Sequence, residues 1–82
     1  MMKIMVRFFS KHRKVIGKKK IEMNIDNETK VSDVLDILTK DYPELNKLRK
    51  FTLVSLNHEY SGMSETLKEN DELAFFPPVG GG

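Results

Sequence analysis

Apolar and polar side chains alternate along several stretches of this chain, and a two-residue period is typical of β-strands. In the first stretch, Ile4, Val6 and Phe8 fall on one face. The same pattern predicts strands over residues Lys3–Phe9, Lys20–Asp26, Phe51–Leu56, Glu59–Tyr60 and Glu72–Phe76. We expect the first two strands to form a hairpin whose connection is a basic turn that contains Gly17.

The hydrophobic period changes between Val31 and Tyr42, where apolar residues recur every three or four positions. This spacing places Val34 and Leu38 on one face and predicts an amphipathic helix. Pro43 marks its expected end, because a proline disfavours helical backbone at the residue before it. Residues 44–50 are expected to add a short helical turn.

Two strands, one main helix and further strands follow one another along the chain. This order predicts an α+β protein with a β-grasp (ubiquitin-like) fold, in which one helix covers one face of a mixed sheet. The strand after the helix should run parallel to an earlier strand, because crossover connections are right-handed. We expect one domain over residues 1–76, followed by an extended tail over residues 77–82.

Two of the expected strands end in consecutive phenylalanines. If Phe8 and Phe75 enter the core with their alternating neighbours, Phe9 and Phe76 must lie on the face that the helix leaves open. Exposed aromatic patches of this kind usually mark a binding site for a partner. The alternative is that a loop covers these aromatic residues at the strand ends.

The chain ends in Pro77, Pro78, Val79 and three glycines, Gly80 to Gly82. Each proline fixes φ and lacks an amide donor, so the sheet should end here and the tail should leave it extended. Glycines have no Cβ and could enter a tunnel too narrow for side chains. The terminal carboxylate of Gly82 is ionised at neutral pH and could attack a nucleotide phosphate to form a mixed anhydride.

Composition limits the other chemistry that this chain of 82 residues could perform. It contains no cysteine, so side-chain thiolates and cysteine-based zinc sites are excluded. The N-terminus lacks a signal peptide and no apolar stretch could span a bilayer, which favours a cytoplasmic protein without membrane contact. We assign no role to His12 and His58, which we expect in surface turns, and we expect no bound metal or cofactor.

Six of the fourteen Lys and Arg residues lie between Lys11 and Lys20. This segment is interpreted either as a solvated loop or as a surface that steers an acidic protein partner. Nucleic-acid binding is disfavoured, because no aromatic residue lies among these cations to stack on bases. A plain binding module that acts through this basic segment, with an incidental glycine tail, remains an alternative.

These features together resemble the MoaD family, the small sulfur-carrier subunit of molybdopterin synthase, one of the ubiquitin-like, ThiS-like sulfur carriers. The residues that carry the resemblance are Phe8, Phe9, Arg13, Gly17, the run Val31–Leu35, Pro43, Asn57, Leu67, Asp71, Glu72, the run Ala74–Val79, Gly81 and Gly82. The chain departs from the family pattern at Lys14, where an acidic residue is usual, and at Asn70, where Gly is common. Asn tolerates the left-handed backbone of a turn, so the fold should persist.

The resemblance implies a cycle in which a MoeB-like adenylyltransferase uses ATP and Mg²⁺ to adenylate Gly82. A sulfur donor protein then converts this carboxylate to a thiocarboxylate. The tail of residues Pro77, Pro78, Val79, Gly80 and Gly81 would insert into a MoaE-like large subunit, in a heterotetramer, and deliver sulfur to the cyclic pyranopterin precursor. The small subunit would not itself be the enzyme.

The resemblance also assigns partner contacts to Phe9, Arg13, Tyr60 and Phe76. Two other carrier roles share the same tail chemistry. One is a ubiquitin-like protein modifier of the small archaeal type, and the other is a sulfur carrier for thiamine or tRNA.

Overall fold

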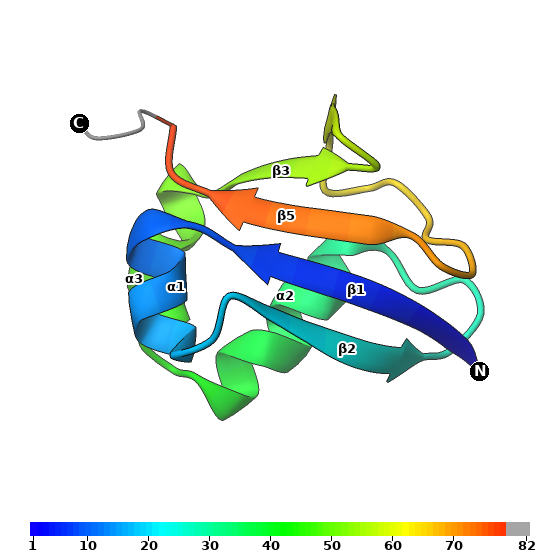
Figure 1. The fold of residues 1–82 in the computed structure, drawn as a ribbon, viewed down its shortest axis with the longest axis horizontal. Helices are drawn as coiled ribbons and strands as arrows, with labels where there is room; N and C mark the ends of the chain where they lie inside the picture. Colours follow the sequence, from blue (N-terminus) through cyan, green and yellow to red (C-terminus); the bar gives the residue numbers. More distant parts are fainter. Residues whose placement is uncertain (79–82) are drawn as a thin grey trace.

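The computed structural model describes residues 1–78, and a five-stranded sheet forms its centre (Figure 1). The strands are β1 (Met2–Phe8), β2 (Lys20–Ile25), β3 (Leu53–Leu56), β4 (Glu59–Ser61) and β5 (Glu72–Phe76). Their order across the sheet is β2-β1-β5-β3-β4. The parallel neighbours are β1 and β5. The strand directly after the helices, β3, runs antiparallel to β5 and so has the same direction as the earlier strand β2, as expected.

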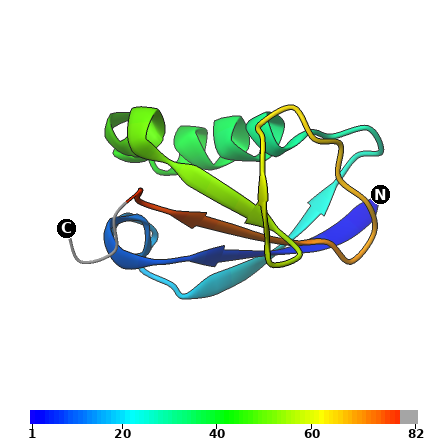
Figure 2. The same ribbon diagram turned by 90° about the horizontal axis from the view of Figure 1, so that it is seen from above.

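Four helical segments connect the strands: α1 (Ser10–Ile16), α2 (Val31–Asp41), α3 (Leu45–Leu48) and the 3-10 turn η1 (Arg49–Phe51). Helix α2 lies across one face of the sheet, as Figure 2 shows. It directs Val31, Val34, Leu35 and Leu38 into the core. The architecture is the expected α+β β-grasp fold. No helix among residues 1–78 is long and apolar enough to cross a membrane.

The core lies between the sheet and α2 and follows the alternation of the two central strands. Ile4, Val6 and Phe8 of β1 are buried, as are Leu73 and Phe75 of β5. The rings of Phe8 and Phe75 stack with their centroids 6.3 Å apart. The predicted strand parity is therefore confirmed, and both strands turn their other side chains toward the face without a helix.

The basic segment after β1 is a helix and a short turn, which corrects the prediction of a basic loop between two hairpin strands. Strands β1 and β2 do pair antiparallel, but α1 connects them. His12 and Ile16 lie four residues apart and are both buried, which places them on one helical face. Gly17 ends α1 with a left-handed φ of 83°, and its N–H donates to Arg13 O at 2.8 Å.

The β3–β4 turn is held to β5 by the side chain of Asn57. Its Oδ1 accepts the N–H of Glu72 at 2.9 Å, and its Nδ2 donates to Asp71 Oδ1, also at 2.9 Å. Asn57 and His58 both have positive φ, as a tight hairpin turn requires. Asn70 likewise has a φ of 67°, so the asparagine predicted to tolerate a left-handed turn does adopt one.

We expect the substitution Asn57→Ala to lower the free energy of unfolding by about 2 kcal/mol, because it removes both hydrogen bonds and strains a left-handed φ. The substitution Asn57→Gly removes the same hydrogen bonds without the strain and should cost less. Chemical denaturation of the two variants measures both costs. Equal costs would show that the backbone conformation of Asn57 does not contribute.

Candidate docking face and C-terminal tail

The face of the sheet opposite α2 carries a cluster of apolar side chains, which we call the docking face: Phe9, Leu53, Tyr60, Ala74 and Phe76. Strand register brings these residues together. Ser55 of β3 lies opposite both Ala74 of β5 and Tyr60 of β4, and Leu53 lies opposite Phe76. Positions along the sequence alone do not predict this cluster, because the three strands must first pair in the correct register.

The aromatic residues of the docking face are accessible to a partner. Phe9 is 49% exposed and Tyr60 is 82% exposed. Phe76 is half-buried, and its ring centroid lies 6.0 Å from that of Tyr60. Phe9 therefore has the exposure expected from strand parity, and Phe76 contacts the neighbouring ring of Tyr60.

A shallow polar hollow continues the docking face toward the middle of the sheet. It is lined by Arg7, Phe9, Ser55, His58, Glu72 and Ala74. Arg7 Nε donates to Glu72 Oε2 at 2.7 Å, so these two charges largely satisfy each other. His58 is exposed at the rim of the hollow, as expected for a turn residue. The apolar side chains of the docking face thus lie beside the ion pair of Arg7 and Glu72.

Helix α1 begins beside the docking face and fixes the position of Phe9. The Phe9 N–H donates to Phe75 O at 3.2 Å, and Phe9 O accepts the N–H of His12 at 3.1 Å. Arg13 lies one turn further along α1 and is exposed. It lines a second shallow hollow with Ser10, Lys14 and Gly17. The start of α1 therefore places a cation near the aromatic cluster.

The tail begins where β5 ends, at the end of the sheet beside α1 and α3 (Figure 1). Pro77 is half-buried and Pro78 is exposed. The four remaining tail residues, Val79, Gly80, Gly81 and Gly82, lie outside the described residues. The tail is thus attached directly next to the docking face, because Phe76 is both the last residue of β5 and part of that face.

Comparison with known proteins places this geometry in a family. The model of the ThiS family matches residues 6–82. The chain belongs to the ThiS family. It is 30% identical over 79 residues to the molybdopterin synthase sulfur carrier subunit of Arabidopsis thaliana, and the match covers 96% of this chain and 82% of the relative.

Two archaeal relatives are similar over nearly their whole length. Small archaeal modifier protein 3 of Haloferax volcanii is 32% identical, with 99% of this chain and 100% of that protein covered. The crystal structure of SAMP1 from the same organism matches with a TM-score of 0.82 and 30% identity, and the match covers 98% of this chain and 99% of that one. The resemblance inferred from the tail and the strands is thereby confirmed.

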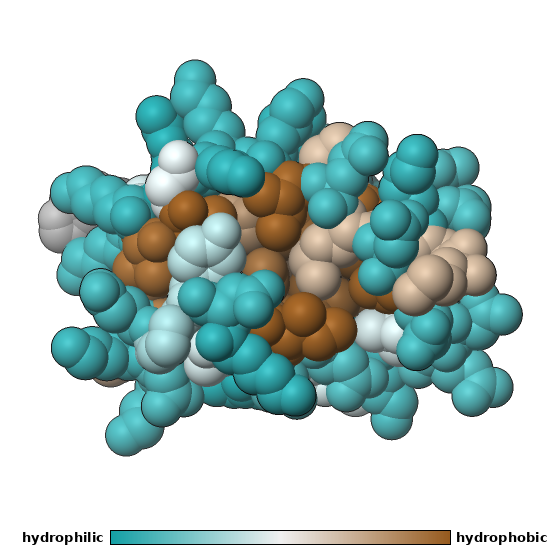
Figure 3. All heavy atoms as spheres, turned by 90° about the horizontal axis from the view of Figure 1, so that it is seen from below, coloured by the Kyte–Doolittle hydropathy of each residue, from teal (hydrophilic) through white to brown (hydrophobic). Residues whose placement is uncertain are grey.

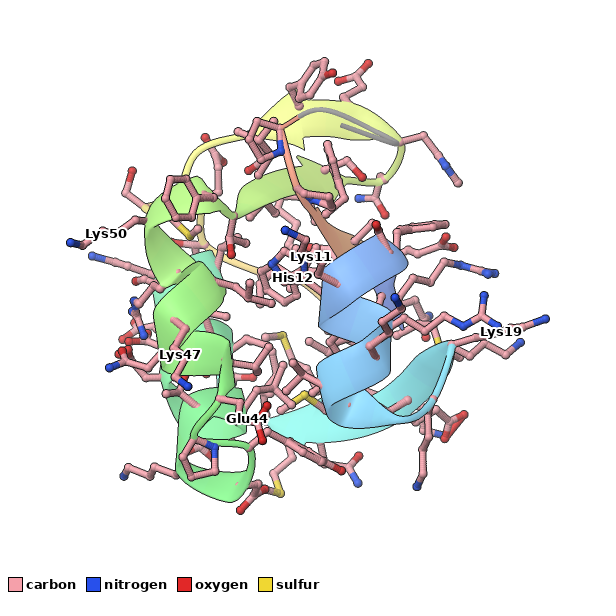
Figure 4. The ribbon with its side chains drawn as sticks, turned by 90° about the vertical axis from the view of Figure 1, so that its left-hand side faces the viewer. Lys11, His12, Lys19, Glu44, Lys47 and Lys50 are labelled. Carbon is pink, nitrogen blue, oxygen red and sulfur yellow. The ribbon has the colours of Figure 1, made fainter. Side chains whose placement is uncertain are left out.

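His12 of this ThiS-family protein is buried between α1 and the segment that leads into β3, which corrects its predicted place in a surface turn. The side chain lies at the end of the molecule that Figure 4 shows, and the residue is 1% exposed. Thr52 Oγ1 donates to Leu48 O at 2.8 Å, so it accepts from His12 Nε2 at 2.7 Å. The buried His12 Nδ1 has no hydrogen-bond partner among residues 1–78.

Burial lowers the pKa of His12, because a charged imidazolium loses its hydration there. The unfolded chain therefore takes up this proton at a higher pH than the folded chain does. The resulting stability is complete above the unfolded pKa of about 6.5 and is lost as the pH falls through that value toward the folded pKa.

We expect the substitution His12→Gln to reduce the loss of stability between about pH 7 and pH 5, since glutamine cannot take up this proton. Denaturant titrations of the wild-type and variant chains at several pH values measure the slope. His58→Gln is the matched control, because it removes an exposed histidine and leaves His12 in place. Equal slopes for wild type and His12→Gln would contradict the assignment.

The basic residues of the segment are spread over α1, the following turn and the start of β2. Lys11, Arg13 and Lys14 are exposed on α1, and Lys18 and Lys19 are exposed in the turn. Figure 4 shows Lys11 and Lys19 at different places around this end of the molecule.

Residues 1–78 contain no group of three or more acidic, His or Cys side chains that could hold a metal ion.

Proposed function

We propose that this ThiS-family chain is the sulfur-carrier subunit of a molybdopterin synthase and is not catalytic by itself. The observation that supports this most is the position of the docking face directly beside the strand that ends in the Pro-Pro-Val-Gly-Gly-Gly tail. A partner that binds this face receives the tail at the same time. The name of the Arabidopsis relative gives the same role.

In the proposed cycle, the Gly82 carboxylate first attacks the α-phosphate of ATP on a MoeB-like adenylyltransferase with bound Mg²⁺. An acyl adenylate forms and pyrophosphate leaves. A persulfide on a sulfur donor protein then attacks the acyl carbon, AMP leaves, and an acyl disulfide joins the two proteins. A thiol that acts as reductant attacks the donor's cysteine sulfur, forms a disulfide with it, and releases Gly82 as a thiocarboxylate. ATP and Mg²⁺ belong to the activating enzyme in this proposal, and this chain holds no cofactor of its own. We propose the cytoplasm as the compartment of this cycle.

Delivery of the sulfur needs a second partner, which we propose to be a MoaE-like large subunit in a heterotetramer. Phe9, Tyr60 and Phe76 would supply the apolar centre of that interface, as aromatic residues often do. Arg13 would pair with an acidic group at the rim. The tail would then reach the large subunit's active site, where two carriers in turn donate sulfur to the cyclic pyranopterin precursor.

The intact mass of the protein tests the first half of this proposal. The full chain is incubated with the cognate activating enzyme, ATP, Mg²⁺ and a sulfur donor. We expect a mass change equal to the replacement of one oxygen by sulfur, located in the C-terminal peptide. A chain that forms the adenylate but never gains sulfur would refute the carrier role.

A second candidate function is covalent modification of other proteins, because relatives of similar identity are named small archaeal modifier proteins. In that role, a substrate lysine amine would attack the carbonyl of the Gly82 adenylate, AMP would leave, and an isopeptide bond would form. Digestion of cell extracts distinguishes the two roles. Peptides with Gly82 linked to lysine favour the modifier, whereas only free and thiocarboxylated ends favour the carrier.

A further inference from the structure

Strand β2 forms a long open edge of the sheet, on the side away from the docking face. It has six residues, whereas the strand at the other edge, β4, has three. Among residues 1–78, β1 is the only strand that pairs with β2. An open edge presents a row of unpaired N–H and C=O groups to another chain.

The register shows which backbone groups of β2 point outward. Phe8 N–H donates to Lys19 O at 2.9 Å, which makes these two residues a hydrogen-bonded pair in the antiparallel ladder of β1 and β2. Such pairs alternate along a ladder, so Ile21 and Met23 also bond to β1. The N–H and C=O groups of Lys20, Glu22 and Asn24 therefore point to the open side.

The helix side of this edge is apolar. Ile21 and Met23 point toward α2, are half-buried, and pack against the core. Figure 3 looks at this edge of the molecule and shows apolar side chains gathered in the middle, framed by hydrophilic ones. A strand added to β2 would cover part of this surface, since every second side chain of the added strand would face the same way.

The sequence of this edge is complementary to itself when read in the opposite direction. If two copies of β2 pair antiparallel around Met23 and the pairing extends one residue past the strand, Lys20 of one copy lies opposite Asp26 of the other, and the reverse pair forms as well. Glu22 then lies opposite Asn24 of the second copy. A register centred on Glu22 would instead place the two Glu22 carboxylates opposite each other, which is unfavourable.

The apolar side chains match in the same register. Ile21 of one copy lies opposite Ile25 of the other, and the two Met23 side chains meet on the two-fold axis. We propose that a second copy of this chain pairs with β2 in this register and joins the two five-stranded sheets into one. The symmetry places both α2 helices on the same side of the joined sheet.

This self-association is compatible with the proposed function and does not depend on it. Strands β1 and β5 separate β2 from β3 and β4, so the docking faces of both copies stay accessible. The dimer would present two C-terminal tails. Each charge pair and apolar cross-strand pair contributes modestly, so we expect an association that depends on concentration and weakens as salt rises.

Exchanging the charges at Lys20 and Asp26 tests the proposed register of the two β2 strands. Sedimentation equilibrium of the full chain, from micromolar to millimolar concentration, is expected to show a monomer–dimer equilibrium. Lys20→Asp and Asp26→Lys each place like charges opposite each other and should raise the dimer dissociation constant about tenfold or more. The double variant restores opposite charges and should recover the dimer. Both positions are exposed, and circular dichroism checks that each variant folds.

A cysteine cross-link tests the same register independently, since the natural chain has no cysteine. Met23→Cys places two thiols across the two-fold axis in a non-hydrogen-bonded pair, at a spacing that permits a disulfide. It should oxidise to a covalent dimer faster than the matched control Lys47→Cys, whose exposed side chain is on α3.

Three results would overturn the proposal. The first is a chain that stays monomeric at every concentration. The second is a dimer that tolerates both single charge reversals. The third is a dimer that is lost in Phe76→Ser, which would assign self-association to the docking face instead of β2.

Discussion

A chain that lacks Gly81 and Gly82 is expected to lose sulfur transfer completely, while its free energy of unfolding stays within about 0.5 kcal/mol of that of the full chain. The two glycines follow Pro77 and Pro78, past the last strand of the sheet. Their removal takes away the reacting carboxylate and shortens the tail, and it leaves every residue of the described core in place. Intact mass after sulfuration and thermal unfolding measure the two effects separately.

A single alanine added after Gly82 should have the same result, because it moves the carboxylate one residue further and places a side chain at the end of the glycine run. The matched control is an extension before Met1, which is 86% exposed. That extension should leave sulfur transfer unchanged. Sulfur uptake by the truncated chain would place the reactive group elsewhere and refute the assignment to Gly82.

Local patterns predict most of this fold. The alternation in β1 and β5 requires one phenylalanine of each pair to be buried, and Phe8 and Phe75 are. The helical period ends at Pro43, and α2 ends at Asp41. These features depend on residues a few positions apart, so the sequence contains the information directly.

The segment after β1 has a structure that its composition does not predict. Six cations and a glycine favour a loop, yet His12 and Ile16 have the four-residue spacing of a short helix, and Gly17 has the position of a helix end. Because histidine is a polar residue type, the hydrophobic pattern gives no sign that His12 is buried. Its stabilising partner, Thr52, is 40 residues away and cannot be found by spacing.

The sequence predicts part of the docking face. Strand parity indicates Phe9 and Phe76, but it carries no information about Tyr60, which only the family resemblance indicates. The contact between Tyr60 and Phe76 requires β3 to pair with both β4 and β5. Long-range pairing of this kind is decided by the whole core and not by any one segment.

The substitution Phe75→Ala should lower the free energy of unfolding by about 3–5 kcal/mol, because it leaves a large cavity in the core. Phe75 is 1% exposed and stacks on Phe8. Domains of this size are stable by only about 5–15 kcal/mol, so a substantial part of the total stability should disappear. Chemical denaturation followed by circular dichroism measures the change.

The neighbouring substitution Phe76→Ala is the matched control, with the opposite balance of effects. Phe76 is half-buried against Tyr60 on the docking face, so its loss should cost only about 1 kcal/mol of folding stability. Binding to the cognate large subunit should weaken by about 2 kcal/mol, the usual range for a central aromatic residue in an interface. Calorimetry measures this binding. The assignment of Phe75 to the core and Phe76 to the docking face requires the first residue to act on folding and the second on binding. It would be wrong if Phe76→Ala destabilised the chain as much as Phe75→Ala, or if Phe76→Ala bound the large subunit normally.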